Sequence, residues 1–469
     1  MERIHRMFAL LATLALLLPL LAACGGETPA TTAPAPAAAA TNTTAPAPAA
    51  AATDTTAPAA AAPTNTTAPA AGNAGGNKTT LTMATWAGAD ESKELQAIID
   101  KINASATDYQ IVYNPAPADY YTKIQTMIAG NQAPDLFWLD QDHIVPYADK
   151  GALLDLTDML KADKSPAAQL DDYFPSQLAT AQYNGKTYGL PWIAQPVVLY
   201  YNPALFDAAG VKYPDENMTW DDFKAAAEKL TKPDGSQFGT TLNGWPPIWM
   251  FVWQAGGELI APDLKSSPID SPEALAGEQF YADLIYNKKY APSEATIKEQ
   301  GFEAMMRAGK VATFWGGAAD SYDYDHQNDP KIPVMKMALP PKNATTGKRT
   351  TFAWTASTSI SAATKHPDLA YKALIALTEG TQHWKVPAPR KSLATADVIS
   401  ASVPGKKESA PIIVQAMQDM RSEVVIPRMD EWNTMYWEQF QDLLYHGKGS
   451  AADLAAKARP QLEELLPGR

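Results

Sequence analysis

From Lys78 onward, hydrophobic residues follow two alternating periods along the chain. Residues 81–86 have the pattern of a short strand, and the apolar spacing of Leu95, Ile98 and Ile102 then follows the period of a helix. The same alternation predicts further strands at residues 109–113, 135–139, 197–202, 311–315 and 354–360. Further helices are expected in three places: residues 120–128, the segment that opens at Thr219, and most of the chain after Pro411.

The segment at Thr219 carries a signal for the start of a helix. Asp222 follows Thr219 by three residues, so each side chain can bond the other residue's backbone N–H, as in a capping box. Strands that alternate with helices in this way favour a parallel, doubly wound sheet. The folded part, about 390 residues, is long for a single core, so we expect an α/β fold in two lobes.

The first 23 residues have the layout of a secretory signal peptide. Arg3 and Arg6 precede an apolar run over residues 7–21, and two alanines then lead directly to Cys24. The run is shorter than the ~20 apolar residues of a membrane-spanning helix, which argues against a permanent span. Two alanines before a lone cysteine resemble a bacterial lipobox. That resemblance implies that Cys24 is diacylated and tethers an exported protein to a membrane.

Residues 24–77 have the composition of a linker. They are almost entirely Ala, Pro, Thr, Gly and Asn, and a Thr-(Asn/Asp)-Thr-Thr-Ala-Pro unit recurs at residues 41–46, 53–58 and 64–69. Such a segment has too little apolar surface to form a core. The composition therefore predicts a disordered tether rather than a domain built of repeats.

Charge and residue usage argue against several kinds of ligand. The net charge is −13, whereas proteins that bind nucleic acid or anionic lipid need basic patches. The six histidines are scattered without metal-type spacing, and Cys24 is the only cysteine. We therefore expect no metal site, no cofactor and no disulfide, so the folded part depends on a large hydrophobic core.

A series of short motifs occurs in an order that is typical of one family. The motifs are GNQAPDLF at 130–137, KGALLDLT at 150–157, YNGKTYGLP at 183–191, LYYN at 199–202, LFDAAG at 205–210, TWDDF at 219–223, QAGGE at 254–258 and AGKVA at 308–312. Each motif alone is weak. Their order over about residues 80–380 resembles the extracellular solute-binding proteins of carbohydrate ABC transporters, the maltose-binding-protein-like group. The later sequence matches less, although Ile426-Pro427 ahead of Trp432 is similar to a ligand-facing segment of that family.

The resemblance implies a fold and a role. The fold is a type II periplasmic-binding-protein-like α/β fold with two lobes, each a mostly parallel sheet flanked by helices, that close over a sugar about a hinge. Lobe 1 would span residues 78–190 and 352–402, and lobe 2 residues 191–351 and 403–469. The chain would cross between the lobes near Pro191, Thr351 and Ser402.

The role implied by the resemblance is binding, without catalysis. The expected ligand is a sugar or oligosaccharide, and the expected partner is the permease of an ABC importer. The protein would be a monomer on the extracytoplasmic face of the cell membrane or in the periplasm, anchored through Cys24.

A sugar offers apolar C–H faces and a rim of hydroxyl groups, so its site needs aromatic rings beside a few polar side chains. In open α/β sheets ligands bind beyond the carboxyl ends of the strands. Trp86 ends the predicted strand 81–86 and leads into a loop that carries Asp90, and Asp140 follows the predicted strand 135–139, although Asp140 would equally serve as a helix N-cap. The other candidates lie at strand or helix ends or at positions similar to those of the family: Gln195, Trp245, Trp249, Trp315, Trp354, Arg390 and Trp432.

Some of these candidates also have a purely structural interpretation. Trp245, Trp249 and Trp253 recur every four residues and share one helical face, as a core stripe does. If the helix starts at Pro246-Pro247, Trp245 lies at its mouth and Trp253 in the core. Arg390 would equally form a surface salt bridge.

Three other classes of protein remain as alternatives. A surface glycoside hydrolase would need a pair of carboxylates, for which Asp140 and Asp142 are available. An iron-binding protein would use adjacent tyrosines, but Tyr200 and Tyr201 on one strand point to opposite faces. A receptor for polyamines or oligopeptides has the same fold, and an excess of carboxylates beside the aromatic rings would favour polyamines.

Overall fold

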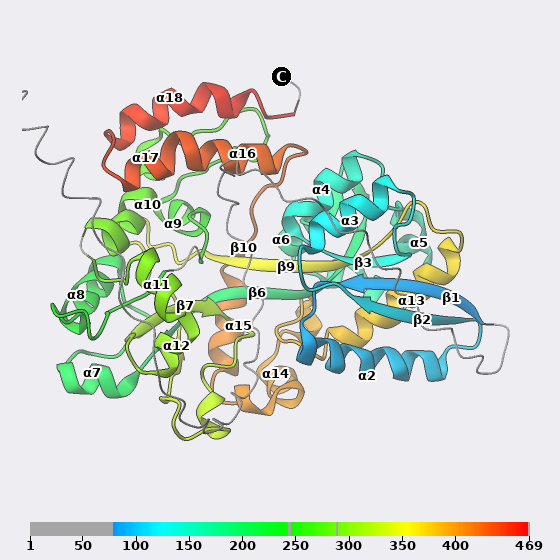
Figure 1. Ribbon diagram of the computed structural model, residues 1–469, viewed down its shortest axis with the longest axis horizontal. Helices are drawn as coiled ribbons and strands as arrows, with labels where there is room; N and C mark the ends of the chain where they lie inside the picture. Colours follow the sequence, from blue (N-terminus) through cyan, green and yellow to red (C-terminus); the bar gives the residue numbers. More distant parts are fainter. Residues whose placement is uncertain (1–77, 243–244, 288, 468–469) are drawn as a thin grey trace, which may run out of the picture. The chain divides into compact units, whose positions relative to one another are not determined.

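Figure 1 shows a computed structural model of the chain, which describes residues 78–242, 245–287 and 289–467. The chain divides into two units, residues 1–40 and 41–469, and every described residue belongs to the second. The predicted signal peptide at 1–23, the lipidation of Cys24 and the tether at 24–77 lie outside the described residues. Within the described ranges, no helix is long and apolar enough to cross a membrane.

The strands confirm the alternation that the sequence predicts, with ends that shift by a few residues. They are β1 (Thr79–Thr85), β2 (Tyr109–Pro115), β3 (Leu136–Asp140), β4 (Gln182–Tyr183), β5 (Lys186–Thr187), β6 (Gly189–Tyr201), β7 (Thr313–Gly317), β8 (Lys336–Ala338), β9 (Thr351–Ile360) and β10 (Met420–Arg421).

Helices fill most of the sequence between the strands. Up to β7 they are α2 (Ala89–Ser105), α3 (Tyr120–Ala129), α4 (Gln141–Asp149), α5 (Thr157–Ala162), α6 (Pro175–Ala179), α7 (Pro203–Ala209), α8 (Trp220–Leu230), α9 (Trp249–Ala255), α10 (Pro272–Ala282), the π-helix η3 (Asp283–Asn287), α11 (Glu294–Gln300) and α12 (Phe302–Arg307). After β9 they are α13 (Pro367–Thr381), α14 (Ala396–Ser402), α15 (Ala410–Gln418), α16 (Met429–Tyr436), the π-helix η7 (Trp437–Gln441), α17 (Asp442–Tyr445) and α18 (Ala451–Glu463).

Short 3₁₀ turns complete the described elements. They are η1 (Pro166–Ala168), η2 (Leu170–Asp172), η4 (Asp325–Gln327), η5 (Lys391–Leu393) and η6 (Pro404–Lys406). The capping box predicted at Thr219 is present, because its hydroxyl accepts from the Asp222 N–H and the Asp222 carboxylate accepts from the Thr219 N–H.

Eight strands form the main sheet, in the order β2-β1-β3-β9-β6-β7, with β8 beside β6 and β10 beside β9. Figure 1 shows β6 and β9 side by side, and their register runs from Gly189 opposite Ser359 to Pro196 opposite Ala353. The second half of β6, from Val197, pairs instead with β7 and β8. Two long strands therefore join the part of the sheet near β1 to the part near β7.

The strand directions correct one expectation. Among the described strands of this sheet, the pairs β1–β2, β1–β3 and β9–β10 are parallel. β6 is antiparallel to β7, β8 and β9, and β9 is also antiparallel to β3. The sheet is mixed, so the prediction of mostly parallel sheets is wrong in this respect. Apolar periodicity identifies a strand but carries no information about its direction. The α/β class itself is confirmed.

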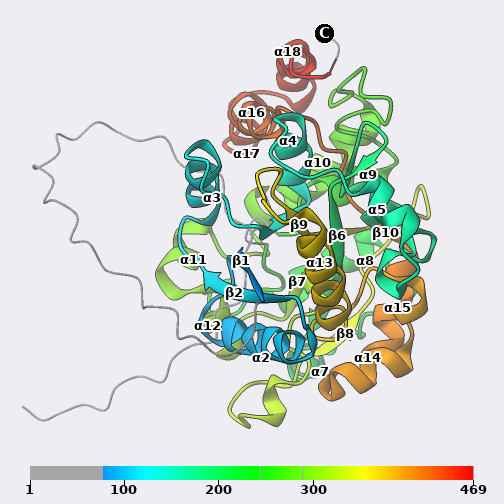
Figure 2. The same ribbon diagram turned by 90° about the vertical axis from the view of Figure 1, so that its right-hand side faces the viewer.

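Two of the buried clusters of the core lie on either side of this junction. The first surrounds β1, β2 and β3 and is covered by α2 and α13, which lie next to each other in Figures 1 and 2. The second is built from α8, α9, α10 and the helices after Met429. The half-buried ring of Trp354 packs against both clusters, so β9 brings this side chain to the boundary between them.

A carboxyl group is buried inside the second cluster. Glu278 on α10 is fully buried and accepts hydrogen bonds from the hydroxyl groups of Tyr436 and Tyr445 and from Gln441 Nε2. Burial raises the pKa of Glu278 from 4.5 to about 7, although the three donors act in the opposite direction. The helices after Met429 are thus tied to α10 through a carboxyl group that titrates near neutral pH.

This arrangement predicts a pH dependence of stability. The folded protein keeps the Glu278 proton up to about pH 7, whereas the unfolded chain loses it near pH 4.5. The contribution of Glu278 to the free energy of unfolding is therefore largest below pH 4.5 and falls as the pH rises to about 7. Between pH 5 and pH 8 the melting temperature of the wild type should fall more than that of Glu278→Gln. Equal pH dependences would contradict the assignment.

Candidate functional site

Aromatic rings from the end of β1 and from β9 meet on either side of β3, which lies between these strands in the sheet. Trp86 directly follows β1, and its ring centroid lies 6.1 Å from that of Trp354 on β9 and 6.3 Å from that of Tyr121 on α3. Trp86, Tyr121 and Trp354 are each only partly buried. The structure therefore brings together two of the predicted site residues, and it adds Tyr121, which the sequence did not single out.

The start of α4 places polar groups beside these rings. Asp140, the last residue of β3, caps α4 by accepting from the Asp142 N–H, so the N-cap interpretation is confirmed. The same oxygen, Asp140 Oδ1, lies 2.6 Å from His143 Nδ1, and the imidazole stacks on the Tyr121 ring with centroids 3.5 Å apart. Asp140 thus orients His143, which in turn supports an aromatic face of the site.

Electrostatics at this corner are dominated by carboxylates. Burial lowers the pKa of His143, but the carboxylates of Asp140, Asp142 and Asp430 raise it more, so the pKa ends above its usual value. The imidazole is therefore favoured in its charged form. Within the described residues, no lysine or arginine pairs with any of these three aspartates.

A second carboxylate contact joins α4 to the segment after β10. Gln141 Nε2 donates to Glu423, while Gln141 Oε1 accepts from the Thr355 N–H of β9 at 2.8 Å. Glu423 also hydrogen-bonds Asp142. Burial and the neighbouring Asp142 raise the pKa of Glu423 well above its usual range, which favours the neutral form of Glu423. One oxygen of the pair, Asp142 Oδ1, is buried without a partner among the described residues.

Gln195 lies on the same side of the sheet as Trp354. The two residues are directly opposite each other in the antiparallel pair of β6 and β9, so their side chains share a face. Gln195 is partly buried, and its Nε2 donates to Asp320 Oδ1 at 3.1 Å. Trp354 and Gln195 thus lie on the neighbouring strands β9 and β6, and Trp86 lies at the end of β1, which β3 separates from β9.

The exposed fraction of the three tryptophans near α9 decreases in the order Trp245, Trp249, Trp253. Trp245 is partly buried and meets the ring of Phe352, two residues before Trp354 on β9, at 5.2 Å. Trp249 and Trp253 are buried in the second cluster, as predicted for Trp253. The helix begins at Trp249 rather than at the two prolines, which leaves Trp245 ahead of it. Only Trp245 of the three keeps an accessible surface near the site.

Two other predicted tryptophans are enclosed by the core. Trp315 is fully buried and its Nε1 donates to Thr240. The expectation that it ends a strand is wrong, because β7 continues to Gly317 and Trp315 pairs with Leu199 inside the ladder. Trp432 is also fully buried, with its ring stacked on Tyr436 at 4.9 Å. We leave both out of the proposed site.

Arg390 and Asp90 lie in other surroundings. Arg390 Nε donates to Asp172 at 2.8 Å, and Nη1 donates to Gln382, which favours the ion-pair interpretation of this arginine. Asp90 is on the exposed first turn of α2, where it pairs with Lys93 at 3.0 Å. Neither side chain has a contact with the aromatic rings, so we leave these two residues out as well.

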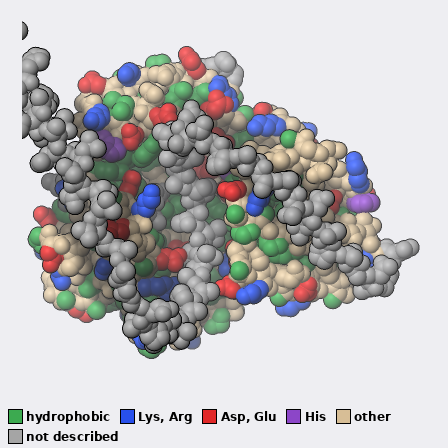
Figure 3. Space-filling model, in the orientation of Figure 1, with side chains coloured by type: hydrophobic (Ala, Val, Ile, Leu, Met, Phe, Trp, Pro, Cys, Tyr) green, Lys and Arg blue, Asp and Glu red, His purple; other side chains and the backbone are tan. Residues whose placement is uncertain are grey.

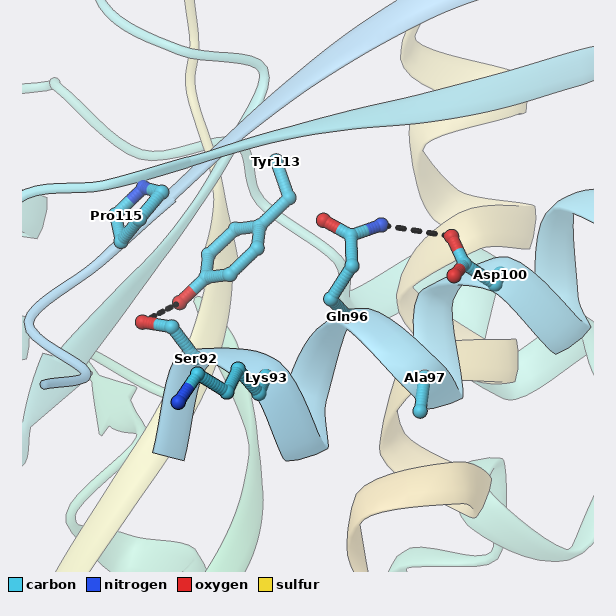
Figure 4. Close-up of a pocket in the computed structure, with 7 residues that line it drawn as sticks. All are labelled: Ser92, Lys93, Gln96, Ala97, Asp100, Tyr113 and Pro115. Carbon is cyan, nitrogen blue, oxygen red and sulfur yellow. Dashed lines mark hydrogen bonds between the residues drawn. The ribbon is translucent and has the colours of Figure 1, made fainter. Parts of the chain in front are cut away.

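Other surface features do not point to a competing site. On the face shown in Figure 3, acidic and basic side chains are interspersed and form no single basic patch. Figure 4 shows a pocket between α2 and the end of β2, where polar side chains bond each other: Ser92 with Tyr113, and Gln96 with Asp100. A second pocket, near α3 and α4, contains none of the predicted residues. In the part of the chain that the structure describes, no three His, Cys, Asp or Glu residues form a group that would hold a metal ion.

Comparison with known proteins decides the family. Residues 86–379, more than half of the chain, match the family described as bacterial extracellular solute-binding protein. The chain belongs to this family. It is a family of binding proteins whose description places them outside the cytoplasm, and the matched residues include Trp86, Asp140, Gln195 and Trp354.

Individual relatives agree with this assignment. A Brucella abortus protein named only as a binding protein is 26% identical over 302 residues, which cover 60% of this chain and 69% of that protein. A maltotriose-binding protein of Pyrococcus abyssi is 27% identical over 201 residues, 42% of this chain and 41% of that protein. An ABC substrate-binding protein of Listeria monocytogenes, solved with cycloalternan, has a TM-score of 0.70 at 23% identity, covering 82% of this chain and 98% of that chain. The type II binding-protein fold is thereby confirmed.

Several residues of the site escaped sequence reasoning. The pattern Asp140-x-x-His143 places the two side chains on one turn of a helix, which is a usable signal. Tyr121, next to Tyr120 at the start of a predicted helix, is a weaker one. Glu423 and Asp320 carry no local signal, because their partners lie far away along the chain.

Proposed function

We propose that the protein is the lipid-anchored, substrate-binding subunit of an ABC importer, that it captures a sugar or oligosaccharide and delivers it to the permease, and that it does no catalysis. The proposal rests on one observation above all: the centroids of two partly exposed tryptophan rings, Trp86 and Trp354, lie 6.1 Å apart, and Gln195 is opposite Trp354 in the sheet. Aromatic faces suit the C–H face of a sugar ring, and the amide suits its hydroxyl groups. The maltotriose-binding relative supports this choice of ligand class.

Lipid anchoring at Cys24 and the tether at 24–77 are part of the proposal, and their support is the sequence alone. An exported protein that must meet a membrane permease gains from a tether, because tethering raises its effective concentration near the partner.

A titration of the wild-type protein tests the proposal. Maltotriose, mannitol and diacetylchitobiose are added to the secreted chain, and the melting temperature and the tryptophan fluorescence are followed. A ligand that binds only the folded state at 100 times its Kd stabilises it by about 2.7 kcal/mol. Binding of a neutral sugar should be insensitive to salt, because no ligand charge is screened. No response to any saccharide, together with a response to a cation, would contradict the proposal.

One observation favours a second candidate, a polyamine receptor. Asp140, Asp142 and Asp430 lie close enough to His143 to raise its pKa, and Glu423 lies close to Asp142. A polycation such as spermidine would pair with carboxylates beside aromatic rings. Spermidine binding that weakens steeply between 10 mM and 300 mM salt would favour this candidate over the sugar. We prefer the sugar because Asp140 already contacts His143, and Glu423 already accepts from Gln141.

A further inference from the structure

The environment of Gln195 fixes the orientation of its side-chain amide. Gln195 Nε2 donates to Asp320 Oδ1 at 3.1 Å, and the amide lies directly over Gly317, where a Cβ atom would come within 1.4 Å of Nε2. A glycine at position 317 is therefore what allows Gln195 to take this position.

Asp320 is itself held from several sides. Its second oxygen, Oδ2, accepts from the Gly317 N–H at 2.9 Å, and its backbone carbonyl accepts from the Tyr200 hydroxyl at 3.1 Å and from Lys406 Nζ. Lys406 is fully buried and forms an ion pair with Asp323 at 2.7 Å. The carboxylate that receives the Gln195 amide thus belongs to a buried network and has little freedom to move.

These contacts leave one face of the Gln195 amide for a ligand. A carboxylate only accepts hydrogen bonds, so the NH₂ group must point to Asp320 and the carbonyl oxygen must point away from it. No described residue donates a hydrogen bond to Gln195 Oε1, and Gln195 is only partly buried. Trp354 lies directly opposite on the same face of the sheet.

We propose that Asp320 is a positioning residue that makes Gln195 present its carbonyl oxygen, so that the site selects ligands with a hydroxyl or amine donor at this point. The inference rests on the proposed function, since Gln195 would be one of its ligand contacts. It assigns Asp320 a role in ligand choice without contact to the ligand.

The network also predicts a pH dependence of binding. Burial raises the pKa of Asp320 to about 6, although Lys406, the Gly317 N–H and Gln195 act in the opposite direction and the Asp323 carboxylate adds to the rise. The hydroxyl groups of Tyr200 and Tyr324 face the same region. Because Oδ2 is engaged by the Gly317 N–H, a proton on Asp320 would sit on Oδ1 and donate to Gln195. The amide would then turn its NH₂ to the ligand, so affinity should fall as the pH drops through about 6.

A pair of variants tests the orientation. In Asp320→Asn the oxygen of the new amide must stay on the Gly317 N–H, so its NH₂ faces Gln195 and forces that side chain to flip. Maltotriose, or whichever saccharide of the panel above binds the wild type, should then bind about 10- to 100-fold more weakly. The reason is that the NH₂ group of the flipped Gln195 faces the hydroxyl donor of the ligand. In the double variant Gln195→Glu/Asp320→Asn an acceptor again faces the ligand, and most of the affinity should return.

Controls separate orientation from folding and from the proposed function. Both variants should melt within a few degrees of the wild type, and Asp320→Asn should lose the fall in affinity below pH 6. Wild-type affinity in Asp320→Asn, or no recovery in the double variant, would overturn the inference. If no saccharide binds the wild type, the proposed function fails. The side-chain NH₂ signal of Gln195 in NMR then tests the inference about Asp320 on its own. It should titrate near pH 6 in the wild type and not in Asp320→Asn, and a signal that stays constant in the wild type would overturn the inference.

Discussion

Replacing Trp354 by alanine should weaken saccharide binding by about 2–4 kcal/mol, or about 30- to 1,000-fold, the range of a central aromatic anchor. The ring is partly exposed and lies 6.1 Å from Trp86, opposite Gln195 in the sheet. A sugar ring that packs against this pair loses most of its apolar contact when one face is removed. Stability should fall less than affinity, because part of the indole surface already faces solvent.

Calorimetric titration of wild type and Trp354→Ala with the same saccharide measures this effect. Trp384→Ala is a matched control, because Trp384 is also partly exposed and packs on Trp192 at 6.0 Å, while its Nε1 is bonded to Glu94. The control should keep the wild-type affinity. If both variants lose affinity equally, the loss reflects the buried cluster around β1, β2 and β3, against which both rings pack, and the site assignment is wrong.

Trp432→Ala should instead destabilise the fold by about 3–5 kcal/mol, as expected when a large buried ring is removed and leaves a cavity. Trp432 is fully buried, stacks on Tyr436 and lies 5.9 Å from the ring of Trp249. Its removal opens the interface between α16 and α9. The family resemblance points to Trp432 as a ligand residue, so this variant separates the two interpretations.

Urea unfolding measures the loss, and Trp437→Ala serves as the control. Trp437 is five residues further on and only partly buried, so its removal should cost less stability. Trp432→Ala should retain saccharide affinity under conditions in which it is folded. If Trp432→Ala keeps the stability of the wild type and loses saccharide affinity, Trp432 contacts the ligand. The conformation that binds the ligand would then differ from the one in which Trp432 is buried.

Local signals in the sequence were sufficient for the elements and for part of the site. The capping box at Thr219 and the strands at 81–86, 135–139 and 354–360 rest on interactions between near neighbours, and the structure contains them all. Trp86 and Asp140 were found because the first ends the predicted strand 81–86 and the second directly follows the predicted strand 135–139. The rule that ligands bind beyond strand ends then needed no knowledge of the strand order.

Local sequence patterns did not predict the direction of the strands or the positions at which they end. β6 and β9 read as ordinary strands, yet each crosses the boundary between two cores and runs antiparallel to the other. At β7 the strand continues through both glycines to Gly317, which moves Trp315 from an open end into the ladder beside Leu199. The direction and the ends of these strands depend on which strands they pair with, and the residue types within each strand do not determine this.

Polar contacts between distant residues were equally hidden. Gln195 and Asp320 are 125 positions apart, and Gln141 and Glu423 are 282 apart, so neither pair leaves a pattern in any short window. Arg390 had two interpretations of equal standing, and its contact with Asp172 across the fold favours the ion pair. The aromatic residues marked the region of the site, while its polar geometry required the folded chain.

The measurement that tests the central claim most directly is a crystal structure of the protein with the saccharide that raises its melting temperature most. We expect a sugar ring against the faces of Trp86 and Trp354, with a hydroxyl group donating to Gln195 Oε1. A saccharide bound elsewhere, with these two rings and Gln195 free of contact, would contradict the account.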